Sequence, residues 1–228
     1  MDLASHFSHI FFQLHYTNHL FINFNKNNMV DQKLNVEYEA TFCDINVDEI
    51  REKIKSLNGR LLKPIFNQKR TVFSLPKGHE IKGGWLRVRD EADKITMSLK
   101  IMESNGMIDG QKEIELTVNS YEQAVSLLKA IGAEEKAVQE TKREVWELDG
   151  VELMIDWWPF LEPVIEIEGK NETGVRKVAE KLGFNWGEAI FNSIDCVYSK
   201  KYNISIERIN NETPEIMFDM NNPFLPNR

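Results

Sequence analysis

The sequence lacks the features that would tie it to a disulfide scaffold, a membrane or nucleic acid. It has two cysteines among 228 residues, Cys43 and Cys196, too few for a disulfide framework or a cysteine-rich metal site. No apolar run approaches the roughly 18 residues that a membrane-spanning helix needs. Its 28 basic and 36 acidic residues give a formal charge of −8, whereas a nucleic acid binder needs net basic surface. We therefore expect a cytoplasmic protein with no membrane and no nucleic acid partner.

The first 28 residues differ in composition from the rest of the chain. They contain one acidic residue, one basic residue and four of the five histidines. Polar residues interrupt the apolar stretch that a secretory signal would need. His15 and His19 are one helical turn apart but have no acidic or cysteine partner, as a metal site would require. We interpret residues 1–28 as a disordered leader or as a stretch before a true start at Met29, followed by a domain over 29–203 and a C-terminal tail over 204–228.

Beyond the leader, short stretches with period-two alternation predict strands, separated by turn residues. The eight predicted strands are 36–42, 68–75, 85–90, 95–101, 112–118, 137–148, 151–157 and 164–168. Asp149-Gly150 is typical of a tight hairpin, so neighbours in sequence should pair antiparallel. Amphipathic periodicity predicts helices at 47–57, 120–132 and 173–182, with a fourth at about 188–202. The tail carries three prolines and should extend over the surface.

Charged residues alternate with apolar ones on five of these strands. Side chains at i and i+2 of a strand point the same way, so Glu37 and Glu39 share one face. The pattern recurs in Arg87 and Arg89, in Thr96, Ser98 and Lys100, in Glu113 and Glu115, and in Glu166 and Glu168. A half-exposed sheet explains alternation alone. It does not explain why acids and bases occupy separate strands, whereas a closed barrel would gather them in a lumen suited to a metal-bound polyanion.

The order of these residues resembles the CYTH superfamily, the triphosphate tunnel metalloenzymes. The resemblance rests on Glu37-x-Glu39, Leu86-Arg87-Val88-Arg89, Lys100 after Thr96-Met97-Ser98-Leu99, Glu113-x-Glu115, Arg143 three residues before Trp146, Asp156, and Glu166-Ile167-Glu168. It implies an α+β fold in which an eight-stranded antiparallel closed β-barrel forms the tunnel and helices pack outside.

The resemblance also implies roles for individual residues. Mg²⁺ or Mn²⁺ would be held by Glu37, Glu39, Glu166 and Glu168. Catalytic candidates, as further ligands or water-positioning groups, would be Glu113, Glu115 and Asp156. Phosphates would be bound by Arg87, Arg89, Lys100 and Arg143. Structural alternatives stay open, with Glu113 and Glu115 as surface groups and Asp156 as the cap of a turn before Pro159.

The sequence departs from the family pattern on three strands and in one turn. Thr41 stands where the opening ExExK motif has lysine, and Arg70 stands where an acid often follows Gln68. Thr141 stands two residues before Arg143, where the family often has another base. Strand parity could place Arg70 in the lumen, where its charge would replace that of the missing lysine. Phe160-Leu161-Glu162 replaces a Gly-Leu-Gly element usual before the last strand, and its Phe160 ends an aromatic turn, Trp157-Trp158-Pro159-Phe160.

The resemblance implies a metal-dependent reaction on a small-molecule triphosphate, namely tripolyphosphate, a nucleoside triphosphate or thiamine triphosphate. Hydrolysis of a phosphoanhydride bond is favoured by Thr41 and the altered turn. Two alternatives remain, a class IV adenylate cyclase that makes cyclic AMP and pyrophosphate, and a catalytically silent module that binds polyphosphate or a nucleotide. The sequence leaves the oligomeric state open.

A chain that begins at Met29 should keep the activity and the melting temperature of the 228-residue chain. The reason is that residues 1–28 supply none of the predicted strands or helices. Parallel activity assays and thermal unfolding of the two chains check this. A large loss in either quantity would show that the histidine-rich segment belongs to the working protein.

Overall fold

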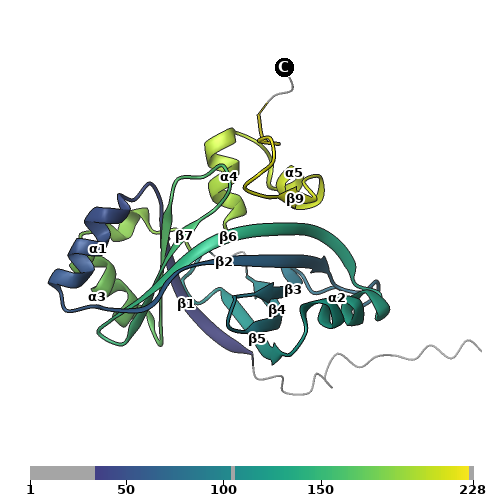
Figure 1. The fold of residues 1–228 in the computed structure, drawn as a ribbon, viewed down its shortest axis with the longest axis horizontal. Coiled ribbons are helices and arrows are strands. Elements are labelled where there is room, and N and C mark those ends of the chain that lie inside the picture. The colour runs from purple at the N-terminus through teal and green to yellow at the C-terminus, as the bar shows by residue number, and fades with distance from the viewer. Residues whose placement is uncertain (1–33, 104–105, 226–228) are drawn as a thin grey trace, which may run out of the picture. The chain divides into compact units, whose positions relative to one another are not determined.

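Eight antiparallel strands close into a barrel in the computed structural model, which describes residues 34–103 and 106–225 (Figure 1). The strands are β1 (Asn35–Phe42), β2 (Arg60–Ser74), β3 (Gly84–Asp90), β4 (Ile95–Met102), β5 (Gln111–Val118), β6 (Glu134–Leu148), β7 (Val151–Trp157) and β8 (Val164–Gly169). Their order is β2-β3-β4-β5-β1-β8-β7-β6, and pairing of β2 with β6 closes the ring. The predicted closed barrel is confirmed, while the leader expected over 1–28 lies outside the described residues.

Three helices lie outside the barrel, as the sequence predicts: α1 (Val47–Ser56), α2 (Tyr121–Ala130) and α3 (Glu172–Leu182). Ile54 of α1 and Val175 of α3 belong to one buried cluster with Ile167 of β8. Leu128 of α2 packs with Phe73 and other barrel residues in a second cluster. Because the helices bury the apolar strand faces on the outside, the alternating charged side chains of the same strands face the lumen.

The C-terminal part of the chain differs from the sequence-based expectation. Residues 186–188 form a short 3₁₀ helix, η1 (Trp186–Glu188), and α4 (Asp195–Tyr202) begins only at Asp195. Between them Ile190 forms an antiparallel bridge with Thr41, in which the Ile190 N–H donates to the Thr41 carbonyl at 2.9 Å. That bridge needs extended backbone, which is why the predicted helix starts late.

The tail contains further regular structure, α5 (Ile206–Asn211) and β9 (Glu215–Ile216). β9 pairs in parallel with β6 at Val138 and Gln139. A third buried cluster joins this tail to the turn after β7, and it consists of Trp158, Val164, Tyr198, Ile209, Ile216 and Phe224. The Tyr198 hydroxyl donates to the Pro159 carbonyl at 2.7 Å. The aromatic turn is therefore the anchor of the C-terminal segment. Within the described ranges, every helix is too short or too polar to cross a bilayer.

Replacing Phe224 by alanine should lower the free energy of unfolding by about 3 kcal/mol or more, the usual cost of emptying an aromatic core site. Phe224 is 2% exposed and its ring lies 4.7 Å from that of Tyr198. Phe218→Ala is the matched control, because Phe218 is 41% exposed in the same tail. Urea unfolding of both variants measures the difference. If both variants lost an equally small amount of unfolding free energy, the C-terminal tail would not contribute to the hydrophobic core.

Candidate functional site

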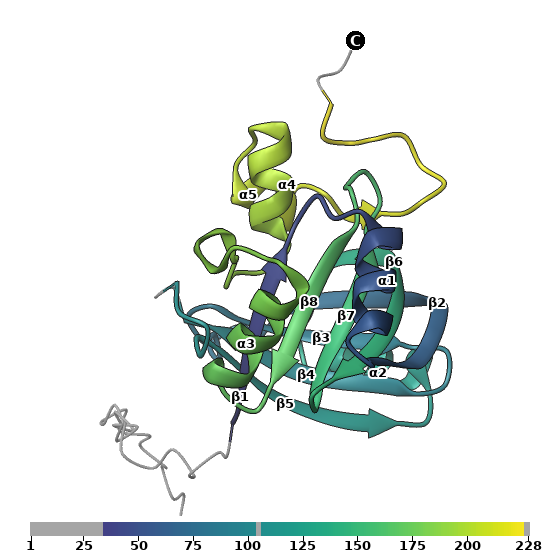
Figure 2. The same ribbon diagram turned by 90° about the vertical axis from the view of Figure 1, so that its left-hand side faces the viewer.

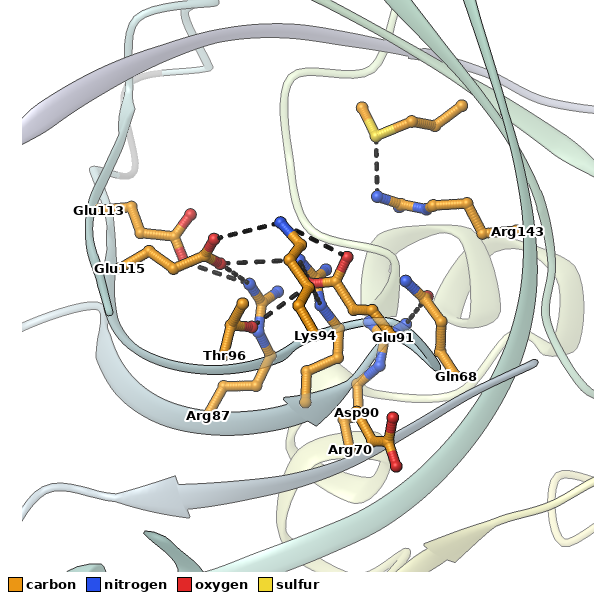
Figure 3. A network of polar contacts seen from close by, with 12 residues as sticks. Gln68, Arg70, Arg87, Asp90, Glu91, Lys94, Thr96, Glu113, Glu115 and Arg143 are labelled. Carbon is orange, nitrogen blue, oxygen red and sulfur yellow. Dashed lines mark hydrogen bonds and ion pairs between the residues drawn. The ribbon is translucent and has the colours of Figure 1, made fainter. Parts of the chain in front are cut away.

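The lumen contains a cavity of about 440 Å³ lined by charged side chains. All the predicted site residues except Glu115 and Asp156 line it: Glu37, Glu39, Arg70, Arg87, Arg89, Lys100, Glu113, Arg143, Glu166 and Glu168. They come from β1, β2, β3, β4, β5, β6 and β8, so closure of the barrel is what brings them together. Figure 3 shows Glu113 and Glu115 on one wall and Arg143 on the opposite wall.

A carboxylate pair lies where β1, β4 and β5 meet. Lys100 Nζ is 3.0 Å from Glu37 Oε2 and 3.4 Å from Glu113 Oε2, and Arg87 contacts Glu113 at 3.1 Å. Burial, together with a hydrogen bond to Glu113, raises the pKa of Glu37 to about 7. Burial also tends to raise the pKa of Glu113. The hydrogen bond from Glu37 and the charges of Lys100 and Arg87 outweigh that effect, so the pKa of Glu113 is lowered. These opposite shifts favour the protonated form of Glu37 and the ionised form of Glu113.

Two carboxylates bind the guanidinium group of Arg143, a residue of β6. Its Nε donates to Asp156 Oδ1 at 2.7 Å, its Nη2 donates to the other Asp156 oxygen, and it reaches Glu166 Oε2 at 2.6 Å. Burial opposes the charge on Arg143, but Asp156 and Glu166 raise its pKa well above the usual value. Asp156 is fully buried. Its carboxylate thus binds Arg143 in a bidentate pair rather than capping the turn before Pro159.

Carboxylates also gather along β1 and β8, where Glu39 lies opposite Glu168 and Thr41 opposite Glu166. Burial raises the pKa of Glu39 well above its usual range, and the charge of Glu166 adds to the effect. Burial also raises the pKa of Glu166, with Asp156 adding, and that of Glu168. Together with Glu37, these groups repel one another in a buried place, an arrangement that a cation would relieve.

The donor set fits a hard divalent ion, because all four groups offer carboxylate oxygen. In the ranges 34–103 and 106–225, no three acidic, histidine or cysteine side chains converge as a ready metal cluster. Glu37 and Glu166 are instead paired with Lys100 and Arg143. Binding of an ion would therefore have to release these two cations toward the lumen.

Arg70 faces the cavity from β2, in agreement with its strand parity. Its Nη2 donates to Thr141 Oγ1 at 2.7 Å and to Gln68 Oε1 at 3.1 Å, and its guanidinium lies 4.5 Å from the Trp158 ring centre. Its Nε has no hydrogen-bond partner. Burial, followed by the charges of Arg89, Arg87 and Arg143, lowers its pKa well below the usual value. The site therefore contains a buried cation that no carboxylate neutralises among the described ion pairs.

One end of the lumen holds an ion network that sequence reasoning missed in part. Glu91, in the turn between β3 and β4, is 7% exposed and accepts a hydrogen bond from Arg89 Nε at 2.9 Å. Lys94 lies 3.8 Å from Glu91 and 3.9 Å from Glu115 (Figure 3). Glu115 also contacts Arg87 and Arg89 at 3.7 Å. The period-two spacing of Glu91 after Arg87 and Arg89 was the signal that could have found it.

Comparisons with known proteins bear on this barrel. The model of the CYTH domain family matches residues 36–189. A conserved hypothetical protein from Pyrococcus furiosus is 21% identical, with a TM-score of 0.58 over 69% of this chain and 96% of its own. A "putative adenylate cyclase" from Vibrio parahaemolyticus is 13% identical, with a TM-score of 0.62 over 72% of this chain and 98% of its own. No curated protein sequence matches significantly.

Proposed function

The chain belongs to the CYTH domain family, and we propose that it is a divalent-metal-dependent enzyme that hydrolyses a phosphoanhydride bond of a triphosphate. The substrate class comprises tripolyphosphate, nucleoside triphosphates and thiamine triphosphate. In phosphoryl transfer, a protein mainly positions the reacting groups and neutralises their charge, and it does not need to supply a covalent nucleophile. A lumen lined by fixed cations and carboxylates supports that chemistry.

The observation that carries the proposal is the buried cationic cluster around Arg70. Burial and the neighbouring Arg89 also lower the pKa of Arg87, to about 10. The Nε atoms of both Arg70 and Arg87 lack hydrogen-bond partners. A polyphosphate would supply acceptors to both and would cancel the repulsion that shifts their pKa values. An organic cation would do neither, and a neutral ligand would leave the repulsion between the arginines uncancelled.

The metal would be Mg²⁺ or Mn²⁺, held by Glu37, Glu39, Glu166 and Glu168. When bound, it would neutralise phosphate oxygens and make a coordinated water more acidic. The paired Lys100 and Arg143 would then turn from these carboxylates toward the phosphate oxygens, adding to Arg87 and Arg89. Without substrate, the carboxylates pair with the bases. With substrate, the carboxylates would bind the metal and the bases would bind the phosphates.

The hydrogen bonds make Glu113 and Asp156 positioning residues in this scheme. Glu113 is tied to Arg87 and Lys100, and its lowered pKa makes it a weak base. Both oxygens of Asp156 bind Arg143. Each carboxylate would hold a cation where negative charge develops on the transferred phosphoryl group, which avoids reorganisation during the reaction. Glu115, which is less buried, would orient Arg87 and Arg89 from the far end of the lumen.

The test is product analysis with tripolyphosphate, ATP and thiamine triphosphate, each with Mg²⁺, with Mn²⁺ and with a chelator. Orthophosphate release that needs the metal supports the proposal. Cyclic AMP with pyrophosphate would identify a cyclase instead. Binding of the triphosphates without any product would identify a catalytically silent module.

The double substitution Glu37→Gln with Glu39→Gln should lower metal-dependent turnover at least about 100-fold, because amides replace two of the four anionic ligands. The protein should stay folded, because glutamine keeps the size of each side chain and the change at Glu39 removes a buried charge that neighbouring carboxylates repel. Glu172→Gln with Glu180→Gln, two exposed positions of α3, is the matched control. Turnover rates and thermal unfolding check both. Full activity in the lumen double variant would rule out these residues as metal ligands.

Arg70→Met should stabilise the protein and impair it at the same time. Removing a buried cation that lacks a carboxylate partner should raise the free energy of unfolding by about 1 to 3 kcal/mol, while Gln68 and Thr141 keep their own hydrogen bond at 2.9 Å. The kcat/KM for the best triphosphate should fall about tenfold or more, as expected for one charge-assisted bond.

Adding Thr41→Lys to Arg70→Met should restore part of that loss if Arg70 replaces the missing lysine. Arg60→Met, at an exposed position of β2, is the control and should change neither quantity appreciably. Urea unfolding and steady-state kinetics provide the two measurements. A single variant as active as the parent would show that the lumen works without either base.

A further inference from the structure

The wall of the cavity is not made by the barrel strands alone. Residues after 189 lie beyond the part of the chain that the family model matches. Five of them line the cavity: Asn192, Ser193, Ile194, Asp195 and Asn210. Their polar groups are therefore present at the site of this chain without belonging to the family domain.

The topology explains why this segment reaches the cavity. β1 pairs with β5 only as far as Glu37, so its later half has a free edge, which Ile190 meets at Thr41. β6 pairs with β7 only from Lys142 onward, and β9 occupies the edge before it. The C-terminal segment therefore covers the end of the barrel where β1 ends and β6 begins (Figure 2). The cluster around Tyr198 and Phe224 fixes it there.

The opposite end of the lumen holds the ion network of Glu91, Lys94 and Glu115. These three residues do not line the cavity. Lys63, near the start of β2, contacts the turn between β3 and β4, where its Nζ donates to the Glu91 carbonyl at 2.6 Å. A triphosphate bound among the arginines would thus have its non-phosphate part at the end covered by the C-terminal segment.

The C-terminal segment adds acceptors for N–H donors at that end, which Lys136 of β6 also lines. Asp195 accepts a hydrogen bond from Ser193 Oγ at 2.6 Å on one oxygen and from Asn210 Nδ2 at 2.7 Å on the other. Each carboxylate oxygen can accept a further bond. Trp85 lines the same cavity and shares the lumen-facing parity of Arg87, so it adds an aromatic surface. An aromatic ring that carries an amino group would satisfy both features.

We infer that Asp195 and Trp85 bind the organic part of the substrate, an aromatic heterocycle with an exocyclic amino group, and so make the enzyme select an organic triphosphate over tripolyphosphate. The inference rests on the proposed function, because it assumes that the triphosphate lies among the arginines. It assigns part of the choice of substrate, through Asp195, to a segment outside the family domain.

The test compares kcat/KM for the better of ATP and thiamine triphosphate with kcat/KM for tripolyphosphate, using the full chain. Asp195→Asn keeps the size of the side chain and should lower this ratio about tenfold or more, since a hydrogen bond to a charged group is lost. Trp85→Leu should lower the ratio as well, because it removes the aromatic surface from the cavity. Asp219→Asn, the same change at an exposed tail position, is the matched control and should leave the ratio as it is.

A ratio within about twofold of the parent value in a folded Asp195→Asn variant overturns the inference while leaving the triphosphatase proposal intact. Thermal unfolding establishes that the variant is folded, and Trp85→Leu decides the matter if it is not. A parent chain that turns over none of the three triphosphates would overturn the proposed function itself, and the inference with it.

Discussion

The enclosure of many charges of both signs in one narrow lumen is the constraint on which this structure depends. A single buried charge is costly, and a buried ion pair does little more than offset its own desolvation. The barrel offsets part of this cost by placing several carboxylates against cations, as in the bidentate pair of Arg143 with Asp156. The pairing is incomplete, because Arg70 has only neutral partners and the acids of β1 and β8 face one another. The unbalanced groups are those best placed to bind a ligand.

Such a lumen has to be stabilised from outside. The outward strand faces are apolar and are buried beneath α1, α2 and α3, with Ile54, Ile167 and Leu153 fully shielded from solvent. Burial of this apolar area supplies the main favourable contribution to the free energy of folding. It offsets the unfavourable free energy of burying charges in the lumen. The same alternation therefore does two things at once, since one residue of each pair builds the core and the next builds the site.

That double use explains what the sequence could and could not predict. Period-two alternation is a local property, so the strands, the closed barrel and the inward direction of residues such as Arg87 and Arg70 could be inferred from it. Glu91 was missed because it lies past the end of β3, where a turn with positive φ at Ala92 directs the chain. The start of α4 and the burial of Phe224 depend on contacts with Thr41 and the aromatic turn, which lie far away in sequence. No local pattern encodes those contacts.

The aromatic turn contacts both Arg70 and the C-terminal segment. Trp158 holds the C-terminal segment through Tyr198 on one side and carries the Arg70 guanidinium over its ring on the other. A lysine at position 41 would have brought its charge from β1, next to the Ile190 bridge by which the C-terminal segment begins. Thr41 is buried and carries no charge, and the buried cation of this part of the lumen comes from β2, where the indole ring of Trp158 stabilises Arg70. In the proposed function, Arg70 would therefore supply from β2 the positive charge that a lysine at position 41 would supply from β1.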